Sequence, residues 1–269
     1  MYIAKKGSVA LGAGIFDSHC HYDDHAFDKD RDELLKSLFA GGVGYLMHAC
    51  TDERSARYGI EAAKKYENYY TSVGFHPECC DDTPDDFISI LRSLLGESEK
   101  IRAIGEIGLD YHYEGYDRER QMYIFEQQVM LANEVSLPVI VHSRNATEDT
   151  MEILRRHKPK GVMHCFSGSA ETAKEVTALG MYIGFTGVLT FKKSKKAKKA
   201  CAAAGLDRLL LETDCPYMAP EPFRGQRSDS SMIEKTAAAA AEILGLTTQQ
   251  VIDKTNENAR ILFGIGVKD

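Results

Sequence analysis

The sequence lacks the paired cysteines and the excess of basic charge that mark several classes of protein. Its seven cysteines include no Cys-x-x-Cys pair, which argues against a zinc ribbon or a disulfide scaffold in a chain of 269 residues. With 33 basic and 40 acidic residues the formal net charge is −7, which counts against a protein that coats nucleic acid by bulk electrostatics. The net charge does not argue against an enzyme that binds a few phosphates through metal ions, because the metals bring their own positive charge.

The sequence also lacks a predicted membrane span, a signal peptide and a linker. The N-terminal stretch MYIAKKGSVALGAGIF is too short and too rich in glycine to cross a bilayer, and no convincing cleavage site follows it. No repeat or low-complexity block divides the chain. We therefore expect one cytoplasmic domain over residues 1–269, since a single barrel domain takes roughly 250 residues.

Eight short apolar runs recur along the chain, and amphipathic segments separate most of them. Such runs are typical of strands buried on both faces of a parallel sheet. They cover residues 14–19, 43–50, 70–76, 101–108, 138–143, 161–166, 181–188 and 208–214. Helices are predicted over 30–40, 53–67, 85–95, 118–135, 146–157, 170–179, 193–204, 229–244 and 247–264. Eight such units predict a closed (β/α)8 TIM barrel with an additional C-terminal helix; a doubly wound open sheet is the alternative.

Side chains that can bind metal gather at the predicted strand ends, where barrel enzymes place their active sites. His19 and His21 end the first strand two positions apart, so both imidazoles face the same way and can reach one ion. Five other strands contribute His76, Glu106, His142, His164 and Asp214. A single strand histidine is usually a core residue, but five of the nine histidines lie at or near strand ends. The other four are interpreted as structural: His25, His48, His112 and His157.

The residue types suit a pair of metal ions. Two ions about 3.5–4 Å apart need a carboxylate that bridges them, and Glu106 suits this position. The remaining candidates divide into one set of His19, His21 and Asp214 and another of His142 and His164. Water between the ions would become the nucleophile, because coordination lowers its pKa toward neutrality, and Asp214 is placed to accept its proton.

The order and spacing of these motifs resemble the TatD family of metal-dependent deoxyribonucleases in the amidohydrolase superfamily. The resemblance runs from about residue 15 to residue 264 and includes 17-DSHCH-21, 74-GFHP-77, 103-AIGEIGLDYH-112, 141-VHSRNA-146, 164-HCFSG-168, 211-LETDCPY-217, 224-RGQR-227 and 256-NENARILFG-264. It implies an amidohydrolase-like barrel with two divalent ions, whose ligands are His19, His21, Glu106, His142, His164 and Asp214. It also implies that His76 meets the scissile phosphate. The ions would be Mg²⁺, Mn²⁺ or Zn²⁺.

Several further residues are candidates for the substrate or for support of the ligands. Arg144, Arg224 and Arg227 suit phosphate geometry, with a solvated rim as the alternative. Glu212 is expected to orient a metal ligand, or else to form a salt bridge inside the barrel. Ser228 stands where family members often carry Asn.

A run of six lysines lies within residues 192–199 and follows the seventh predicted strand. It would form either a cradle for the nucleic-acid backbone or a solvated helix face.

The resemblance implies a deoxyribonuclease that trims single-stranded DNA from the 3′ end, as a monomer, with DNA repair or turnover as its role. A second interpretation keeps the same site but changes the bond, as in an ester or amide hydrolase such as a D-aminoacyl-tRNA deacylase, with tRNA as the partner. A third is a barrel that has lost catalysis and only binds. The complete set of candidate ligands argues against this third interpretation.

Overall fold

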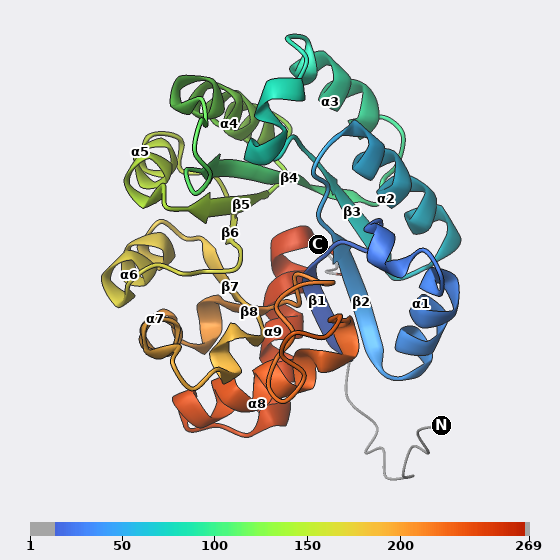
Figure 1. Cartoon of the computed structure of the whole chain (residues 1–269), viewed down its shortest axis with the longest axis vertical. Helices are drawn as coiled ribbons and strands as arrows, with labels where there is room; N and C mark the ends of the chain where they lie inside the picture. The colour runs from blue at the N-terminus through green and yellow to red at the C-terminus, as the bar shows by residue number, and fades with distance from the viewer. Residues whose placement is uncertain (1–13, 267–269) are drawn as a thin grey trace.

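The computed structural model describes residues 14–266, in which eight parallel strands follow one another around a sheet in chain order (Figure 1). The strands are β1 (Ile15–Cys20), β2 (Val43–His48), β3 (Tyr69–Val73), β4 (Ile101–Asp110), β5 (Val139–Arg144), β6 (Gly161–Met163), β7 (Tyr182–Phe185) and β8 (Leu209–Leu211). A parallel bridge between Cys20 and Cys215 joins the two edges, so the sheet curls into a nearly closed barrel. The doubly wound alternative is wrong, because sequential strand order leaves no point at which the winding reverses.

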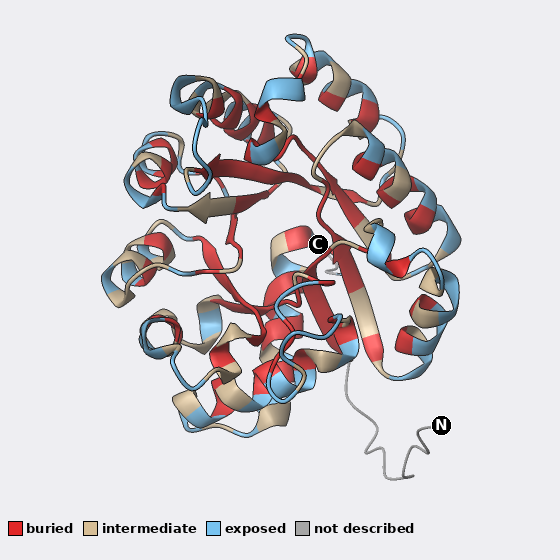
Figure 2. Cartoon of the chain, viewed as in Figure 1, coloured by how far each residue is buried: buried red, intermediate tan, exposed pale blue. Residues whose placement is uncertain are grey.

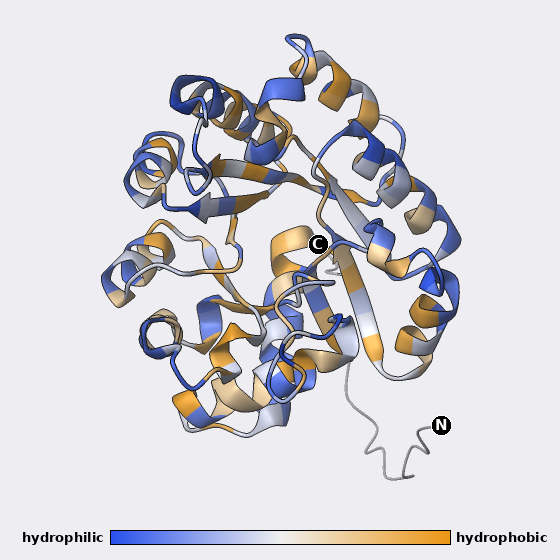
Figure 3. Ribbon diagram, viewed as in Figure 1, coloured by the Kyte–Doolittle hydropathy of each residue, from blue (hydrophilic) through white to orange (hydrophobic). Residues whose placement is uncertain are grey.

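Helices connect the strands and surround the barrel (Figure 1). They are α1 (Arg31–Ala40), α2 (Glu53–Lys65), α3 (Phe87–Leu95), α4 (Arg118–Glu134), α5 (Thr147–His157), α6 (Ala170–Ala178), α7 (Lys195–Ala204), α8 (Ile233–Leu244) and α9 (Thr248–Phe263). Short 3₁₀ helices cover His25–Phe27, Pro77–Asp82, Gly187–Thr190, Leu206–Arg208 and Ser230–Met232. The helices bury the face toward the strands and expose the other, and their hydropathy follows the same division (Figures 2 and 3).

One end of the barrel interior is apolar and is covered by α9, the predicted additional helix. Side chains from most of the strands and from α9 form one buried cluster there, in which Phe263 stacks on Phe16 at 5.9 Å between ring centroids. Leu210 of β8 belongs to this cluster, and alternate residues of an extended chain face the same side. Glu212 and Asp214 come after Leu210 in the chain and therefore lie nearer the opposite end of the barrel. That end is the polar mouth.

Several strands end earlier than the apolar runs predict. β6 stops at Met163 and β8 at Leu211, so His164 and Asp214 lie just beyond the hydrogen-bonded ladder. Asp214 has a φ of 58°, which no strand residue adopts, so the chain leaves the extended conformation at this residue. His76 likewise follows β3 and caps a 3₁₀ helix that begins at Pro77. Candidate ligands are therefore held by turns at the mouth as well as by strands.

Two helices begin later than predicted for local reasons. Residues 229–232 form a 3₁₀ turn instead of the start of α8, because the Asp229 side chain accepts a hydrogen bond from the backbone N–H of Ser231. α7 begins at Lys195 rather than at residue 193. Within residues 14–266 no helix has both the length and the apolar character to span a bilayer. The expectation for the first 13 residues lies outside the described part of the chain.

Candidate metal centre

His19, His21 and Asp214 come together where β1 ends beside the turn after β8. The Nε2 atoms of His19 and His21 lie 3.0 Å apart, and Oδ1 of Asp214 lies 3.3 Å from His21 Nε2 and 3.7 Å from His19 Nε2. The backbone N–H of Asp214 donates to the carbonyl of His19 at 3.0 Å, which holds the two segments in register. Three candidate ligands are thus brought to one point from opposite ends of the sequence.

Glu106 of β4 presents its two carboxylate oxygens to two different groups of imidazoles. Its Oε2 lies 3.2 Å from His19 Nε2 and 3.7 Å from His21 Nε2. The contacts of its Oε1 are with His164 Nε2 at 2.6 Å, His142 Nδ1 at 3.1 Å and His76 Nε2 at 3.3 Å. This carboxylate, which is nearly fully buried, therefore stands between two clusters of nitrogen donors.

The spacing of these atoms matches what a divalent cation requires. Ligands held about 2.1 Å from an ion in tetrahedral or octahedral geometry lie roughly 3.0–3.4 Å from one another. Most donor pairs in the cluster fall close to this range, from 2.6 Å for His164–Glu106 to 3.7 Å for His21–Glu106. All six predicted ligands lie in this cluster, and His76 lies in it as well. Imidazole nitrogens with carboxylate oxygens suit several first-row divalent metals.

Asp110 supports His142, a function that the sequence analysis did not assign. Its Oδ2 lies 2.9 Å from His142 Nε2, so in a metal-bound site Nε2 would keep the proton and leave Nδ1, which faces Glu106, to bind the ion. Asp110 is four residues after Glu106 on the same long strand, within the GEIGLDYH motif. The even spacing on one strand is the signal that points to it.

Asp17 is a second unassigned carboxylate, and it braces the end of β1. It is fully buried and accepts hydrogen bonds from the backbone N–H and the hydroxyl of Thr213 at 3.0 and 2.6 Å, and from the Ser230 hydroxyl at 2.6 Å. Burial raises the pKa of Asp17 to about 7 despite these bonds. Its contacts tie the strand that carries His19 to the turn that carries Asp214.

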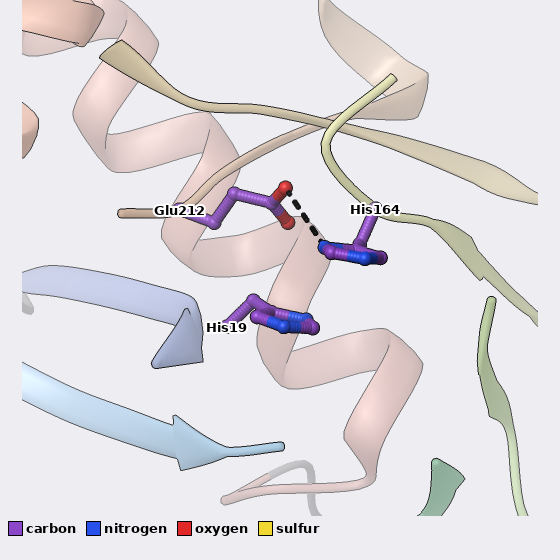
Figure 4. A group of neighbouring side chains, drawn as sticks. All are labelled: His19, His164 and Glu212. Atoms are coloured by element: carbon purple, nitrogen blue, oxygen red, sulfur yellow. Dashed lines mark ion pairs between the residues drawn. The ribbon is translucent and has the colours of Figure 1, made fainter. Parts of the chain in front are cut away.

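Glu212 lies beside His164 and His19, with its carboxylate directed toward the His164 ring, as Figure 4 shows. The rings of His19 and His164 stack with centroids 3.8 Å apart, and Oε1 of Glu212 lies 3.7 Å from His164 Nδ1. The same oxygen accepts a hydrogen bond from the backbone N–H of Cys165 at 2.5 Å. Gly184 makes room for this carboxylate, since a side chain there would collide with it. The position is consistent with support of His164.

The carboxylates and three of the imidazoles, those of His21, His142 and His164, hold one another in charged forms. Burial alone would raise the pKa of Glu106, but the charges of His164 and His76 outweigh it and hold the pKa well below its usual range. Burial lowers the pKa of His21, but the hydrogen bond to Asp214 and the charge of Glu106 prevail and raise it to about 9. Protons on His21, His142 and His164, whose pKa values are raised, thus balance the buried carboxylates in the metal-free protein, whereas burial lowers the pKa of His19 and of His76.

We expect metal affinity to rise with pH between about 6.5 and 9, because an ion must displace the proton from His21. In the metal-free protein, the stability that protonated His21 contributes is fully present below its unfolded pKa near 6.5 and is lost as pH rises through about 9. Titration calorimetry with Mn²⁺ in two buffers of different ionisation enthalpy measures the protons released. An affinity and a proton count that do not change over this range would contradict the expectation.

Two of the three predicted arginines, Arg144 and Arg227, have different surroundings. Arg144 lies over the Tyr113 ring at 5.3 Å, with its Nη1 3.9 Å from Asp110 Oδ2 and its side chain partly exposed at the mouth. Arg227 is held by Asp30 through two hydrogen bonds of 2.7 and 2.6 Å. This pairing favours a bracing function for Arg227, and its predicted contact with substrate stays a prediction.

The other predicted rim residues and histidines lie outside the ligand cluster. Most of the lysines in residues 192–199 are exposed, and within residues 14–266 none of the six forms an ion pair at 4 Å or less. Ser228 is buried, and its backbone N–H donates to Pro216. His48 is buried beside Ser55, with 3.3 Å between His48 Nε2 and the hydroxyl. His157 contacts Glu126 at 2.7 Å, in keeping with its structural interpretation.

Proteins with similar sequences include metal-dependent hydrolases. The model of the TatD related DNase family matches residues 16–264. The uncharacterized metal-dependent hydrolase YabD of Bacillus subtilis is 37% identical over 93% of this chain and 99% of its own length. The protein named 3′-5′ ssDNA/RNA exonuclease TatD of Erwinia tasmaniensis is 31% identical over 93% of this chain and all of its own length.

The fold agrees with a solved structure as well. The crystal structure of YjjV, a TatD homologue from Escherichia coli, superposes with a TM-score of 0.88 at 30% identity, and the match covers 93% of this chain and 98% of that one. The chain belongs to the TatD related DNase family of metal-dependent hydrolases.

Proposed function

We propose that this protein is a two-metal deoxyribonuclease that removes nucleotides from the 3′ end of single-stranded DNA. The observation that carries the proposal is the position of Glu106, whose two oxygens face separate groups of imidazoles. A carboxylate in this position suits a bridge between two ions, with Mg²⁺, Mn²⁺ and Zn²⁺ as the candidates. The polarity and the substrate are those in the name of the Erwinia tasmaniensis relative.

The ligands divide between the two faces of Glu106. His19, His21 and Asp214 would hold one ion and His142 with His164 the other, and Asp110 keeps His142 in the tautomer that binds. When bound, the ions would polarise the phosphate oxygens and lower the pKa of water, which supplies the nucleophile. Asp214, at the open edge of the cluster, is placed to accept the proton of that water.

His76 is placed to donate a hydrogen bond to the phosphate. Its Nδ1 accepts from the backbone N–H of Glu78 at 3.1 Å, so the proton of the neutral ring is on Nε2. Burial lowers the pKa of His76 despite the charge of Glu106, which favours this neutral form. The Nε2–H points into the cluster, where it would reach a phosphate oxygen or the leaving oxygen. The Arg144 guanidinium at the mouth suits a neighbouring phosphate.

The direct test uses protein stripped of metal by a chelator and single-stranded DNA labelled at its 5′ end. Mg²⁺, Mn²⁺ and Zn²⁺ are added back separately, and gels follow the shortening of the strand. We expect ion-dependent shortening one nucleotide at a time, and a loss of about 10³-fold or more in the Asp214→Asn variant.

Two other outcomes would count against the proposal. A wild-type protein that binds two ions and leaves DNA intact would refute the nuclease, and D-aminoacyl-tRNA would then be the next substrate to test. Equal activity in wild type and Asp214→Asn would point to a contaminating nuclease.

A further inference from the structure

A cavity of about 570 Å³ opens beside the candidate metal centre. Its walls come from the turn after β1, from Phe191 after β7 and from the loop after β8. The backbone N–H of Asp24 donates to the carbonyl of His21 at 3.1 Å, and that of Tyr217 donates to Asp214 at 2.9 Å. Two walls therefore start directly from candidate ligands, and the cavity adjoins the edge of the site that Asp214 occupies.

The cavity is lined by flat apolar surfaces. Tyr217 and Met218 are 56% and 41% exposed, although tyrosine and methionine side chains of this size are usually more buried. The Tyr217 hydroxyl donates to Asp24 Oδ2 at 3.0 Å, which holds the ring across the cavity from one wall to another. Phe191, which is partly buried, supplies a second ring to the lining. Aromatic rings that solvent can reach are surfaces on which nucleobases stack.

The cavity also offers one planar cation, which stacks on a ring of the lining. The guanidinium of Arg224 lies 4.4 Å from the centre of the Phe191 ring, and within residues 14–266 it has no carboxylate partner at 4 Å or less. Arg227, three residues later, is instead bound to Asp30 by two hydrogen bonds. The loop is thus anchored by one arginine, while the other stays available to a base or a phosphate.

We propose that this cavity is a nucleoside subsite, which holds the base and sugar of the nucleotide whose phosphate lies at the metal centre. The inference rests on the proposed nuclease function and names how the substrate is held. Stacking between Tyr217, Phe191 and the Arg224 guanidinium accepts any base, because every base has a π face.

Two small phosphodiesters with the same leaving group test the subsite. One is the p-nitrophenyl ester of thymidine 5′-monophosphate, and the other is methyl p-nitrophenyl phosphate, which has no nucleoside. In Tyr217→Ala and Phe191→Ala we expect KM for the thymidine ester to rise on the order of tenfold, while kcat/KM for the methyl ester stays unchanged. Tyr123→Ala is the matched control, because Tyr123 is 55% exposed on α4 and does not line the cavity.

Calorimetric binding of thymidine 5′-monophosphate to the metal-loaded protein separates this inference from the proposed function, because it needs no turnover. If the wild type binds the nucleotide at least tenfold more tightly than inorganic phosphate, and Tyr217→Ala removes that advantage, the subsite holds even where neither ester is hydrolysed. Failure of hydrolysis would then count against the nuclease alone. Equal losses on both esters, or nucleotide binding that Tyr217→Ala and Phe191→Ala leave unchanged, would overturn the subsite.

Discussion

Replacing Glu106 with glutamine is expected to reduce hydrolysis by about 10³-fold or more and to lower the number of ions bound per chain. The amide has one oxygen in place of two, so it cannot serve both groups of imidazoles that the carboxylate faces. It also removes the buried negative charge that raises the pKa of His164 and would neutralise part of the charge of the ions. Steady-state rates and elemental analysis of the purified variant measure the two effects.

Glu78→Gln is the control for this prediction. Glu78 is exposed, lies near the mouth two residues after His76, and undergoes the same loss of charge. Its variant is expected to keep its ions and its rate within about twofold. An active Glu106→Gln protein with a full complement of ions would show that the carboxylate is not the bridge.

Gly108→Ala is expected to have the largest effect on folding, a loss of roughly 3 kcal/mol or more in the free energy of unfolding. Gly108 has a φ of 146°, which L side chains rarely adopt, and a Cβ atom there would collide with the carbonyl oxygen of His142 on β5. The neighbouring backbone that must shift carries a candidate ligand. Thermal unfolding should show a midpoint lowered by roughly 6–12 °C for a chain of this size.

Gly115→Ala separates the collision from the effect of φ alone. Gly115 also has a positive φ, 86°, but nothing lies within 4 Å of a Cβ atom built on it. We expect a cost of about 1 kcal/mol at this position. If both variants unfold at the same temperature, the close approach of β4 and β5 is not what requires glycine at position 108.

The order of strands and helices follows from local patterns in the sequence, which is why it could be predicted. Buried runs such as 139–144 and amphipathic segments such as 118–134 differ in period, and each period can be seen within a few residues. Strand ends were less predictable, because apolar residues continue past the last ladder bond. Residues 186–188, for example, are buried or partly buried in a turn rather than in β7.

The sequence by itself determined the alternation that makes a barrel and the candidate ligands, since parallel strands in sequence bring their ends to one mouth. The tertiary structure decided which atoms meet there. Asp17 accepts a hydrogen bond from Ser230, which is 213 residues away in the sequence, and Arg227 pairs with Asp30, which is 197 residues away. No local sequence pattern predicts either pair. For the same reason only the fold shows that Arg224 stacks on Phe191 and forms no ion pair within residues 14–266. Contacts between residues far apart in the sequence depend on the conformations of the loops at the mouth. Those conformations are set by the packing of the whole barrel.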